Sequence, residues 1–185
     1  MKDMEHKGTQ QLETERLILR RFTLEDVNAM YKNWASDDEV TKFMTWPAHP
    51  NTEVTGYVLG DWVSHYTDDD FYQWAIVPKD VGEPVGSISA VKVFDAVSAV
   101  EIGYCIGRKW WHQGITSEAL KALIDFFFDE VGANRVQAVH DPRNPHSGGV
   151  MRKCGMKHEG TLRSLDRNNQ GICDAEYYGI LKSDR

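Results

Sequence analysis

The spacing of hydrophobic residues changes from helical to alternating and back along the chain, and each change predicts an element. Apolar residues recur every three or four positions within 23–35 and 51–65, which predicts two helices, with a shorter helix after Ser36. Alternating apolar residues predict strands over 12–21, 71–77, 86–94 and 99–106. Because short connections join the last three of these strands, we expect them to form an antiparallel meander.

The C-terminal half combines a long helix with strands on either side of it. Gly132 is the expected C-cap of this helix. The apolar face of the helix comprises Ala119, Leu120, Leu123, Ile124, Phe127 and Phe128. A strand over 135–139 and a second helix over 144–154 follow. The chain ends in a hairpin whose strands are expected over 162–165 and 174–181. Because a helix connects the strands at 99–106 and 135–139, these two strands should be parallel, which predicts a mixed α/β sheet.

The length of the chain predicts one domain. A chain of 185 residues can bury a sizeable core. Residues 1–11 are polar and lack hydrophobic periodicity, so we expect a flexible N-terminal tail there. No internal repeat or linker divides the remainder, which predicts a single domain over 12–185.

Charge and cysteine content exclude several classes of protein. The formal net charge is −7, whereas nucleic-acid binding needs a basic face, so we expect no nucleic-acid partner. The negative charge is compatible with an amine substrate. Three cysteines without C-x-x-C spacing predict neither a disulfide framework nor a zinc site, which favours a reducing cytoplasmic location. No apolar run is long enough to span a bilayer, so we expect no membrane association.

A strand, a tight turn and a helix follow one another over 100–123, and this stretch predicts an anion site. The first N–H groups of a helix lack partners within it, and the helix dipole favours negative charge there. We therefore interpret 111–116 as a pyrophosphate cradle, with a turn that serves only packing as the alternative. The Walker A pattern is absent, and Gly103 and Gly107 do not have the spacing of a dinucleotide fingerprint.

The residues of this turn resemble the acetyl-CoA loop of the GNAT acetyltransferases, Q/R-x-x-G-x-G/A. Trp111 stands at its first position, Gly114 at its Gly and Thr116 at its last position. Trp111 and Thr116 depart from the general pattern. A Trp in first place is similar to the RimJ/RimL branch, the ribosomal-protein N-acetyltransferases, and Thr116 is small enough for close backbone approach.

A second stretch, 140–156, carries a second resemblance to the same family. The GNAT pattern N-x-x-A-x-x-x-Y-x-x-x-G-F is matched by Asn144 and Gly155. Ser147 stands at the Ala position and Met151 at the Tyr position, so the family's usual catalytic Tyr is missing. The RimJ/RimL branch similarly has Asp-Pro-x-Asn-x-x-Ser here.

The resemblance covers most of 12–181 and implies a fold and an activity. The implied fold is α/β, with a mixed, mostly antiparallel splayed sheet flanked by helices on both faces and pantetheine between two diverging strands. The implied reaction moves acetyl from acetyl-CoA to a primary amine by direct attack in a ternary complex, without a metal. A protein N-terminal α-amine is the acceptor that it suggests. A small amine (a polyamine, an amino acid or an antibiotic), a non-catalytic acyl-CoA-binding module, a nucleotide-binding protein and a homodimer stay open.

The resemblance also assigns the cofactor contacts. Backbone groups at the end of the strand would pair with the pantetheine amides, and a backbone N–H near Cys105 or Ile106 would stabilise the developing oxyanion. The turn would hold the pyrophosphate, and Asn144 would fix the pantetheine arm. The expected cofactor-binding residues are Tyr104, Cys105, Ile106, Trp111, His112, Gln113, Gly114, Ile115, Thr116, Asn144 and Ser147.

Three side chains are candidates for catalysis. Ser147 lies one helical turn after Asn144 and could act as general acid or donate a hydrogen bond to the thiolate, with helix capping as the alternative. Glu101 on the central strand and Asp166 before the final turn are candidates for the base that takes the amine proton. A solvated strand carboxylate and a turn-forming Asp are the alternatives for these two. Cys105, buried by its pattern, is expected to be inert.

Overall fold

An eight-stranded mixed sheet runs through the protein, with strands in the order β1-β2-β3-β4-β5-β6-β8-β7. The structure is a computed structural model that describes residues 4–185. Every neighbouring pair is antiparallel except β5 and β6, which confirms the predicted meander and the predicted parallel pair. The strands are β1 (Leu12–Glu13), β2 (Leu17–Arg20), β3 (Gln73–Pro78), β4 (Gly86–Phe94), β5 (Ala99–Ile106), β6 (Arg135–His140), β7 (Lys157–Asn168) and β8 (Gly171–Leu181).

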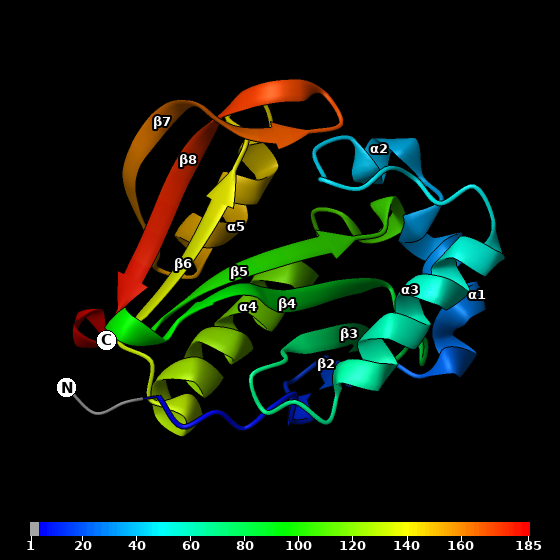
Figure 1. Cartoon of the computed structure of the whole chain (residues 1–185), viewed down its shortest axis with the longest axis horizontal. Coiled ribbons are helices and arrows are strands. Elements are labelled where there is room, and N and C mark those ends of the chain that lie inside the picture. Colours follow the sequence, from blue (N-terminus) through cyan, green and yellow to red (C-terminus); the bar gives the residue numbers. More distant parts are fainter. Residues whose placement is uncertain (1–3) are drawn as a thin grey trace.

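The sheet divides into two arms because β5 and β6 are paired only at their N-terminal ends. Their register joins Ala99–Glu101 to residues 135–137 and stops there. Beyond this point β5 continues beside β4 as far as Ile106, and β6 continues beside β8 as far as His140. The strands diverge as Figure 1 shows, so the expected splay is confirmed.

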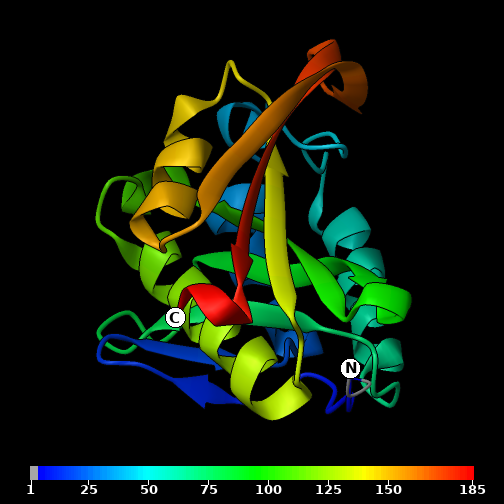
Figure 2. The ribbon, with the colours of Figure 1, turned by 90° about the vertical axis from the view of Figure 1, so that its left-hand side faces the viewer.

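Helices cover both faces of the sheet (Figure 2). On one face lie α1 (Val27–Met30), α2 (Asp38–Thr41) and α3 (Thr52–His65). On the other face lie α4 (Ile115–Phe126), which continues as a π-helical turn over Phe127–Val131, and α5 (Pro145–Lys153). Gly132 ends this continuation at a φ of 81°, a left-handed conformation that suits glycine, so the predicted C-cap is confirmed. None of the helices in the described part of the chain has the length and apolar character that crossing a membrane requires.

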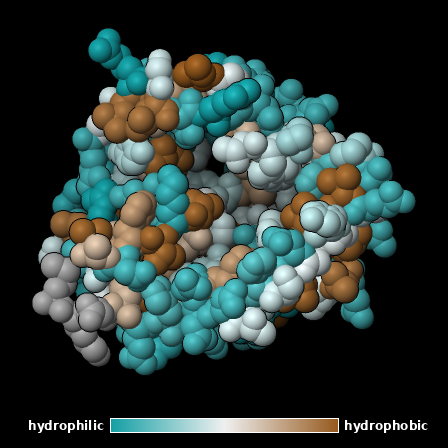
Figure 3. All heavy atoms as spheres, in the orientation of Figure 1, coloured by the Kyte–Doolittle hydropathy of each residue, from teal (hydrophilic) through white to brown (hydrophobic). Residues whose placement is uncertain are grey.

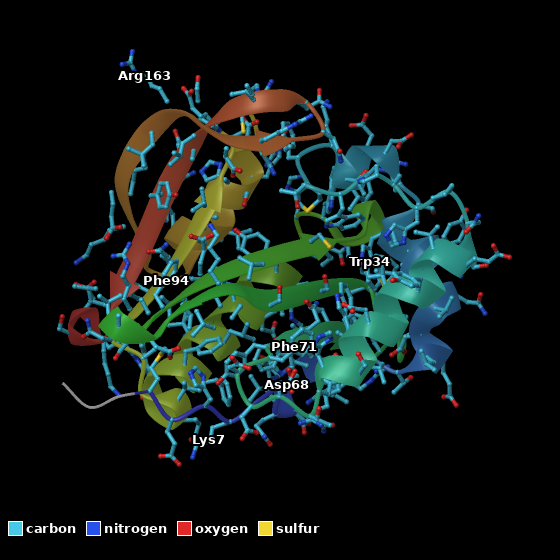
Figure 4. All side chains as sticks on the ribbon, in the orientation of Figure 1. Lys7, Trp34, Asp68, Phe71, Phe94 and Arg163 are labelled. Carbon is cyan, nitrogen blue, oxygen red and sulfur yellow. The ribbon has the colours of Figure 1, made fainter. Side chains whose placement is uncertain are left out.

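Two hydrophobic clusters hold the layers together. The larger packs the apolar face of α4, including the fully buried Leu120 and Leu123, against Trp74 and Ile88 of the sheet. The smaller lies under α1–α3 and contains Trp34, which is completely buried and sits where these helices meet the sheet (Figure 4). The larger cluster lies beneath the turn that leads into α4, so that turn is built on a rigid base.

Two predicted strands differ from the structure. The strand expected over 12–21 is a tight hairpin of β1 and β2, because the Leu17 N–H donates to Thr14 Oγ1 at 3.0 Å and the Thr14 N–H donates to the Leu17 carbonyl at 3.0 Å. The final hairpin begins at Lys157, five residues earlier than expected. This early part has no apolar alternation, because nearly all its residues are exposed along the edge of the sheet.

The N-terminal segment expected as a flexible tail lies along the body of the domain. The Glu5 N–H donates to the Val131 carbonyl at 2.8 Å, and the Gly8 N–H donates to the Asp69 carbonyl at 2.6 Å. Thr9 is 2% exposed, and its hydroxyl donates to a backbone carbonyl. Residues 1–3 of the expected tail lie outside the described residues.

Candidate functional site

A pocket of about 450 Å³ opens where β5 and β6 separate, and Figure 3 shows the surface hollowed between the two arms of the sheet. Its walls come from the end of β5, the turn into α4, the first turns of α5 and the α2 region. Most of the residues predicted from the sequence line it, namely Tyr104, Cys105, Ile106, Trp111, His112, Gly114, Ile115, Thr116, Asn144 and Ser147. Gln113, Glu101 and Asp166 are not among its lining residues within the described chain.

The turn into α4 presents the start of the helix to the pocket. Gly114 is the N-cap of α4 with a φ of 76°, a left-handed conformation that favours glycine. The chain can therefore turn sharply, and the first amides of α4, from Ile115 onward, point out of the helix end without partners in its own ladder. This is the arrangement that binds a phosphate at a helix N-terminus.

Trp111 explains the departure from the family pattern at the first position of the loop. Its indole Nε1 donates to the carbonyl of Ile106 at 2.9 Å, while its ring packs against both hydrophobic clusters. The side chain therefore ties the loop to the end of β5 and fixes the distance between the turn into α4 and the gap between the strands.

Arg16 braces the loop from the β1–β2 hairpin. Its Nη1 donates to the Gln113 carbonyl at 3.0 Å, and its Nε donates to Glu118 Oε2 at 2.7 Å. Thr14 Oγ1 donates to the other oxygen of Glu118 at 2.6 Å. Burial would raise the pKa of Glu118, but these hydrogen bonds outweigh it and lower that pKa. The carboxylate in the first turn of α4 is thus neutralised by Arg16 instead of repelling an anion.

Cationic and histidine side chains surround the same end of the pocket. Arg152 and Lys153 of α5 line it. The rings of His112 and His146 meet edge to face with centroids 4.6 Å apart, which joins the turn into α4 to the start of α5. His112 has a φ of 61°, an uncommon conformation for a residue with a side chain. The positive groups favour a polyanionic ligand at this end.

A turn organised by Asp141 places Asn144. The Asp141 carboxylate accepts from the backbone N–H of Arg143 at 2.8 Å, from its guanidinium, and from Asn168 Nδ2 at 2.8 Å. Burial would raise the pKa of Asp141, but these hydrogen bonds hold it well below its usual range. Asn144 is the N-cap of α5 and makes no side-chain capping bond there, so its amide is available to the pocket.

Ser147 faces the pocket from the first turn of α5 and is contacted by Tyr104. Asn144 occupies the N-cap and Ser147 lies three residues later, so helix capping does not explain Ser147. The hydroxyl of Tyr104 lies 3.0 Å from the Ser147 carbonyl oxygen and 3.0 Å from Ser147 Oγ. Burial raises the pKa of Tyr104, so this hydroxyl stays protonated.

The two carboxylates proposed as bases lie apart from the pocket wall. Glu101 is 6% exposed and accepts hydrogen bonds from Lys92 Nζ at 2.7 Å and from Gln137 Nε2 at 2.8 Å. It is therefore a buried ion-pair partner, and the alternative interpretation of Glu101 as a solvated carboxylate is wrong. Asp166 lies within β7, where its Oδ1 accepts from the Arg167 N–H at 2.8 Å.

The surroundings of all three cysteines favour the protonated thiol. Burial raises the pKa of Cys105 and of Cys173, and it raises the pKa of Cys154 to about 11. Cys105 lines the pocket but is buried beside Ser87. Across residues 4–185 the His, Cys, Asp and Glu side chains form no group of three or more that could hold a metal ion.

Several residues of the site escape reasoning from sequence. Val40 and Met44 line the pocket from the α2 region, which is distant in sequence and carries no motif. The contact between Tyr104 and Ser147 joins residues 43 positions apart, and the brace from Arg16 spans 97. The role of Asp141 had a signal, because the Asp-Pro-x-Asn pattern includes it.

Comparison with known proteins gives one family. A family model described as an acetyltransferase (GNAT) domain matches residues 16–157. The uncharacterized N-acetyltransferase p20 of Bacillus licheniformis is 31% identical over 175 residues, which is 92% of this chain and 96% of that protein.

Solved structures give the same fold. A GNAT-family acetyltransferase from Bacillus anthracis has a TM-score of 0.82 at 26% identity, over 94% of this chain and 99% of that one. RimL, a ribosomal L7/L12 α-N-protein acetyltransferase in complex with coenzyme A, has a TM-score of 0.83 at 19% identity, over 95% of this chain and 100% of that one. At 19% identity, the similarity to RimL shows a shared fold and nothing more.

Proposed function

The chain belongs to the GNAT acetyltransferase family and is an acetyl-CoA-dependent N-acetyltransferase, and from that premise we propose that it acetylates a protein N-terminal α-amine by direct attack in a ternary complex. One observation carries the proposal. The pocket runs from the phosphate turn through the gap between β5 and β6 to Val40 and Met44. Cofactor and acceptor can therefore meet at one point from two sides.

The cofactor occupies the end of the pocket beside α4 and α5. Its pyrophosphate is held at the start of α4, next to Gly114, and its pantetheine arm follows the unpaired edge of β5 past Asn144. Our assignment of these contacts rests on the shape and charge of the pocket. The acetyl thioester then lies near Ile106 and Ser147, at the middle of the gap.

The amide of Ile106 is the better of the two expected oxyanion donors. The Gly107 N–H donates to the Val85 carbonyl of the neighbouring segment at 2.8 Å, so the amide of Gly107 faces β4. Backbone groups alternate in direction along a strand, so the amide of Cys105 faces β4 as well and that of Ile106 faces the gap. The Trp111 indole bound to the Ile106 carbonyl agrees with this direction.

The reaction needs no covalent enzyme intermediate. The amine nitrogen bonds to the carbonyl carbon, the C–S bond breaks with its electron pair on sulfur, and the amine proton leaves through a base while the thiolate takes up a proton. Cys105 is the only cysteine among the pocket-lining residues of the described chain, and burial raises its pKa, so it is a poor nucleophile. Ser147 is placed to donate a hydrogen bond to the departing sulfur.

The choice of an α-amine follows from the weak basicity of the site. An α-amine has a pKa of about 8, whereas a lysine amine has a pKa of about 10.4, so the α-amine is far easier to neutralise near pH 7.5. Neither proposed base lies on the pocket wall, so proton removal passes through water. Glu101 is the base that we favour, because it lies at the last paired position of β5 and β6, where the gap between the two strands begins.

An acceptor panel tests the proposal. CoA release is measured with short peptides that carry a free N-terminus, the same peptides with a blocked N-terminus and a free lysine, and spermidine; mass spectrometry locates the acetyl group. We expect the free-N-terminus peptides to give kcat/KM values at least about tenfold above the other two sets. Preference for spermidine would assign a small-amine acceptor, and preference for lysine would remove the α-amine argument.

A further inference from the structure

The contact between Tyr104 and Ser147 allows two hydrogen-bond arrangements. The Ser147 carbonyl can only accept a hydrogen bond, whereas the two hydroxyls can each donate or accept. In one arrangement Tyr104 donates to the carbonyl and Ser147 donates to Tyr104. In the other arrangement Tyr104 donates to Ser147 Oγ, and the Ser147 proton turns towards the pocket. Both arrangements use the same 3.0 Å distances, so only hydroxyl protons rotate between them.

The second arrangement is the one that helps a departing thiolate. A hydroxyl that accepts a hydrogen bond becomes a stronger donor in the opposite direction. With Tyr104 donating to its oxygen, Ser147 can give its own proton to a hydrogen bond with sulfur. We propose, on the basis of the function proposed above, that the Tyr104 hydroxyl is a positioning group that orients and polarises Ser147 towards the thiolate of coenzyme A.

No proton leaves either hydroxyl in this arrangement. Burial raises the pKa of Tyr104, so a tyrosinate would be costly there, and a relay that ends on Tyr104 is unfavourable. The pair therefore stabilises negative charge on sulfur by hydrogen bonding. The family pattern has a Tyr where this chain has Met151. The Tyr104 hydroxyl on β5, acting through Ser147 on α5, provides a hydrogen-bond donor beside the same gap.

The binding of coenzyme A itself tests this without any acceptor. Bound coenzyme A is titrated with pH, and its thiolate is followed by ultraviolet absorbance. We expect wild-type protein to lower the pKa of the bound thiol by about one unit relative to free coenzyme A. Tyr104→Phe and Ser147→Ala should each remove most of this shift, and the double variant should remove no more than Ser147→Ala alone.

Turnover gives a second, independent measurement. With the best acceptor of the panel, we expect Tyr104→Phe to lower kcat about tenfold while KM for acetyl-CoA stays the same. The double variant should again match Ser147→Ala. Tyr72→Phe is the control, because it deletes a buried hydroxyl that accepts from the Lys7 N–H at 3.2 Å, remote from the pocket. It should leave both measurements at wild-type values.

The outcomes separate this inference from the function it rests on. If Ser147→Ala abolishes the thiol shift and Tyr104→Phe keeps it, the role of Tyr104 is overturned while that of Ser147 stands. If Ser147→Ala changes neither the thiol pKa nor kcat, the proposed role of Ser147 fails, and that of Tyr104 fails with it. Losses that add up in the double variant would show that the Tyr104 hydroxyl acts independently of Ser147 and would overturn the inference. Desulfo-CoA affinity, measured for each variant, should equal that of wild type if the variants are folded.

Discussion

The two ends of the pocket are built in different ways. The end beside α4 and α5, which we propose for the cofactor and call the cofactor end, is made largely of backbone and short-range contacts. These are a glycine turn, the first amides of α4, and an Asp-Pro-x-Asn turn that places Asn144. The opposite end, which we propose for the acceptor and call the acceptor end, is assembled from segments that are far apart in sequence. There the β7–β8 turn meets the α2 region, where Asn169 Nδ2 donates to the Thr41 carbonyl at 2.8 Å.

This difference indicates which part of the pocket is shared across a family and which part is specific to one member. A turn that presents amides to a phosphate needs a particular backbone, so few residues can serve, and the pattern is visible in sequence. Side chains from several elements can shape an acceptor site in many ways, and fold alone does not define it. Variants at the two ends should therefore have separable effects on cofactor and acceptor.

The largest effect is expected from Gly114→Val at the cofactor end. A β-branched residue is strained at a φ of 76°, so the turn must move and the first amides of α4 lose their common direction. We expect the affinity for coenzyme A, measured by calorimetry, to fall by about three orders of magnitude, or about 4 kcal/mol.

Gly82→Val is the matched control for this variant. Gly82 has a φ of 75°, and like Gly114 it leaves space for a side chain, but it lies in the β3–β4 turn. Both variants should lower the melting temperature to a similar extent, whereas only Gly114→Val should lose coenzyme A. Retained affinity in Gly114→Val would place the pyrophosphate elsewhere.

The next effect is expected at the root of the gap, between the two ends. Glu101→Gln removes the carboxylate that we favour as base, and we expect kcat to fall about 100-fold with the affinity for coenzyme A unchanged. Glu159→Gln, which removes a carboxylate paired with Arg135 at 2.8 Å outside the pocket, should leave kcat unchanged. If instead Asp166→Asn gave the larger loss, the base would be Asp166.

A smaller effect is expected from Asp141→Asn, which loosens the turn before Asn144. We expect KM for acetyl-CoA to rise about tenfold and the free energy of unfolding at pH 7 to fall by about 2 kcal/mol, since hydrogen bonds to a charged group are lost. The pKa of Asp141 is lowered in the folded protein, so its stabilising contribution is present above its unfolded value near 3.8. The stability difference between variant and wild type should therefore shrink as pH falls below about 4.

Asp26→Asn provides the comparison for this pH dependence. The carboxylate of Asp26 is buried and accepts from Arg20 at 2.8 Å, away from the pocket. Burial would raise the pKa of Asp26, and the hydrogen bonds from Arg20 and Thr23 lower it overall. Both variants should lose stability at neutral pH, but only Asp141→Asn should change KM. An unchanged KM would mean that Asn144 keeps its place without the turn.

The motif residues of the cofactor end were predictable from sequence because they belong to two local turns. Trp111, Gly114 and Asn144 stand at motif positions, and the structure brings all three to one pocket. Gln113 was predicted with them but lies outside the lining, because its side chain turns back and donates to the Lys109 carbonyl at 2.8 Å. Position within a motif does not determine the direction of each side chain.

The acceptor end was not predictable for the opposite reason. Val40 and Met44 belong to a short helical region whose apolar pattern predicts only packing. The sequence predicts a final hairpin, but nothing in its pattern indicates that Asn169, in the turn of this hairpin, contacts Trp46, which lies 123 residues earlier in the chain. Such contacts depend on the long β7–β8 hairpin, whose turn reaches towards α2 (Figure 1).

The smallest effect is expected from Asn169→Ala at the acceptor end. The Asn169 side chain donates to the carbonyls of Thr41 and Trp46, each at 2.8 Å, and its backbone N–H donates to the Met44 carbonyl at 3.1 Å. Losing the two side-chain bonds at a partly exposed site should raise KM for the acceptor about threefold to tenfold, with KM for acetyl-CoA unchanged. Asn168→Ala sharpens the test, because Asn168 binds Asp141 instead and should shift KM for acetyl-CoA. If both variants changed the same constant, the two ends would not be separable, and the turn would act on the pocket as one unit.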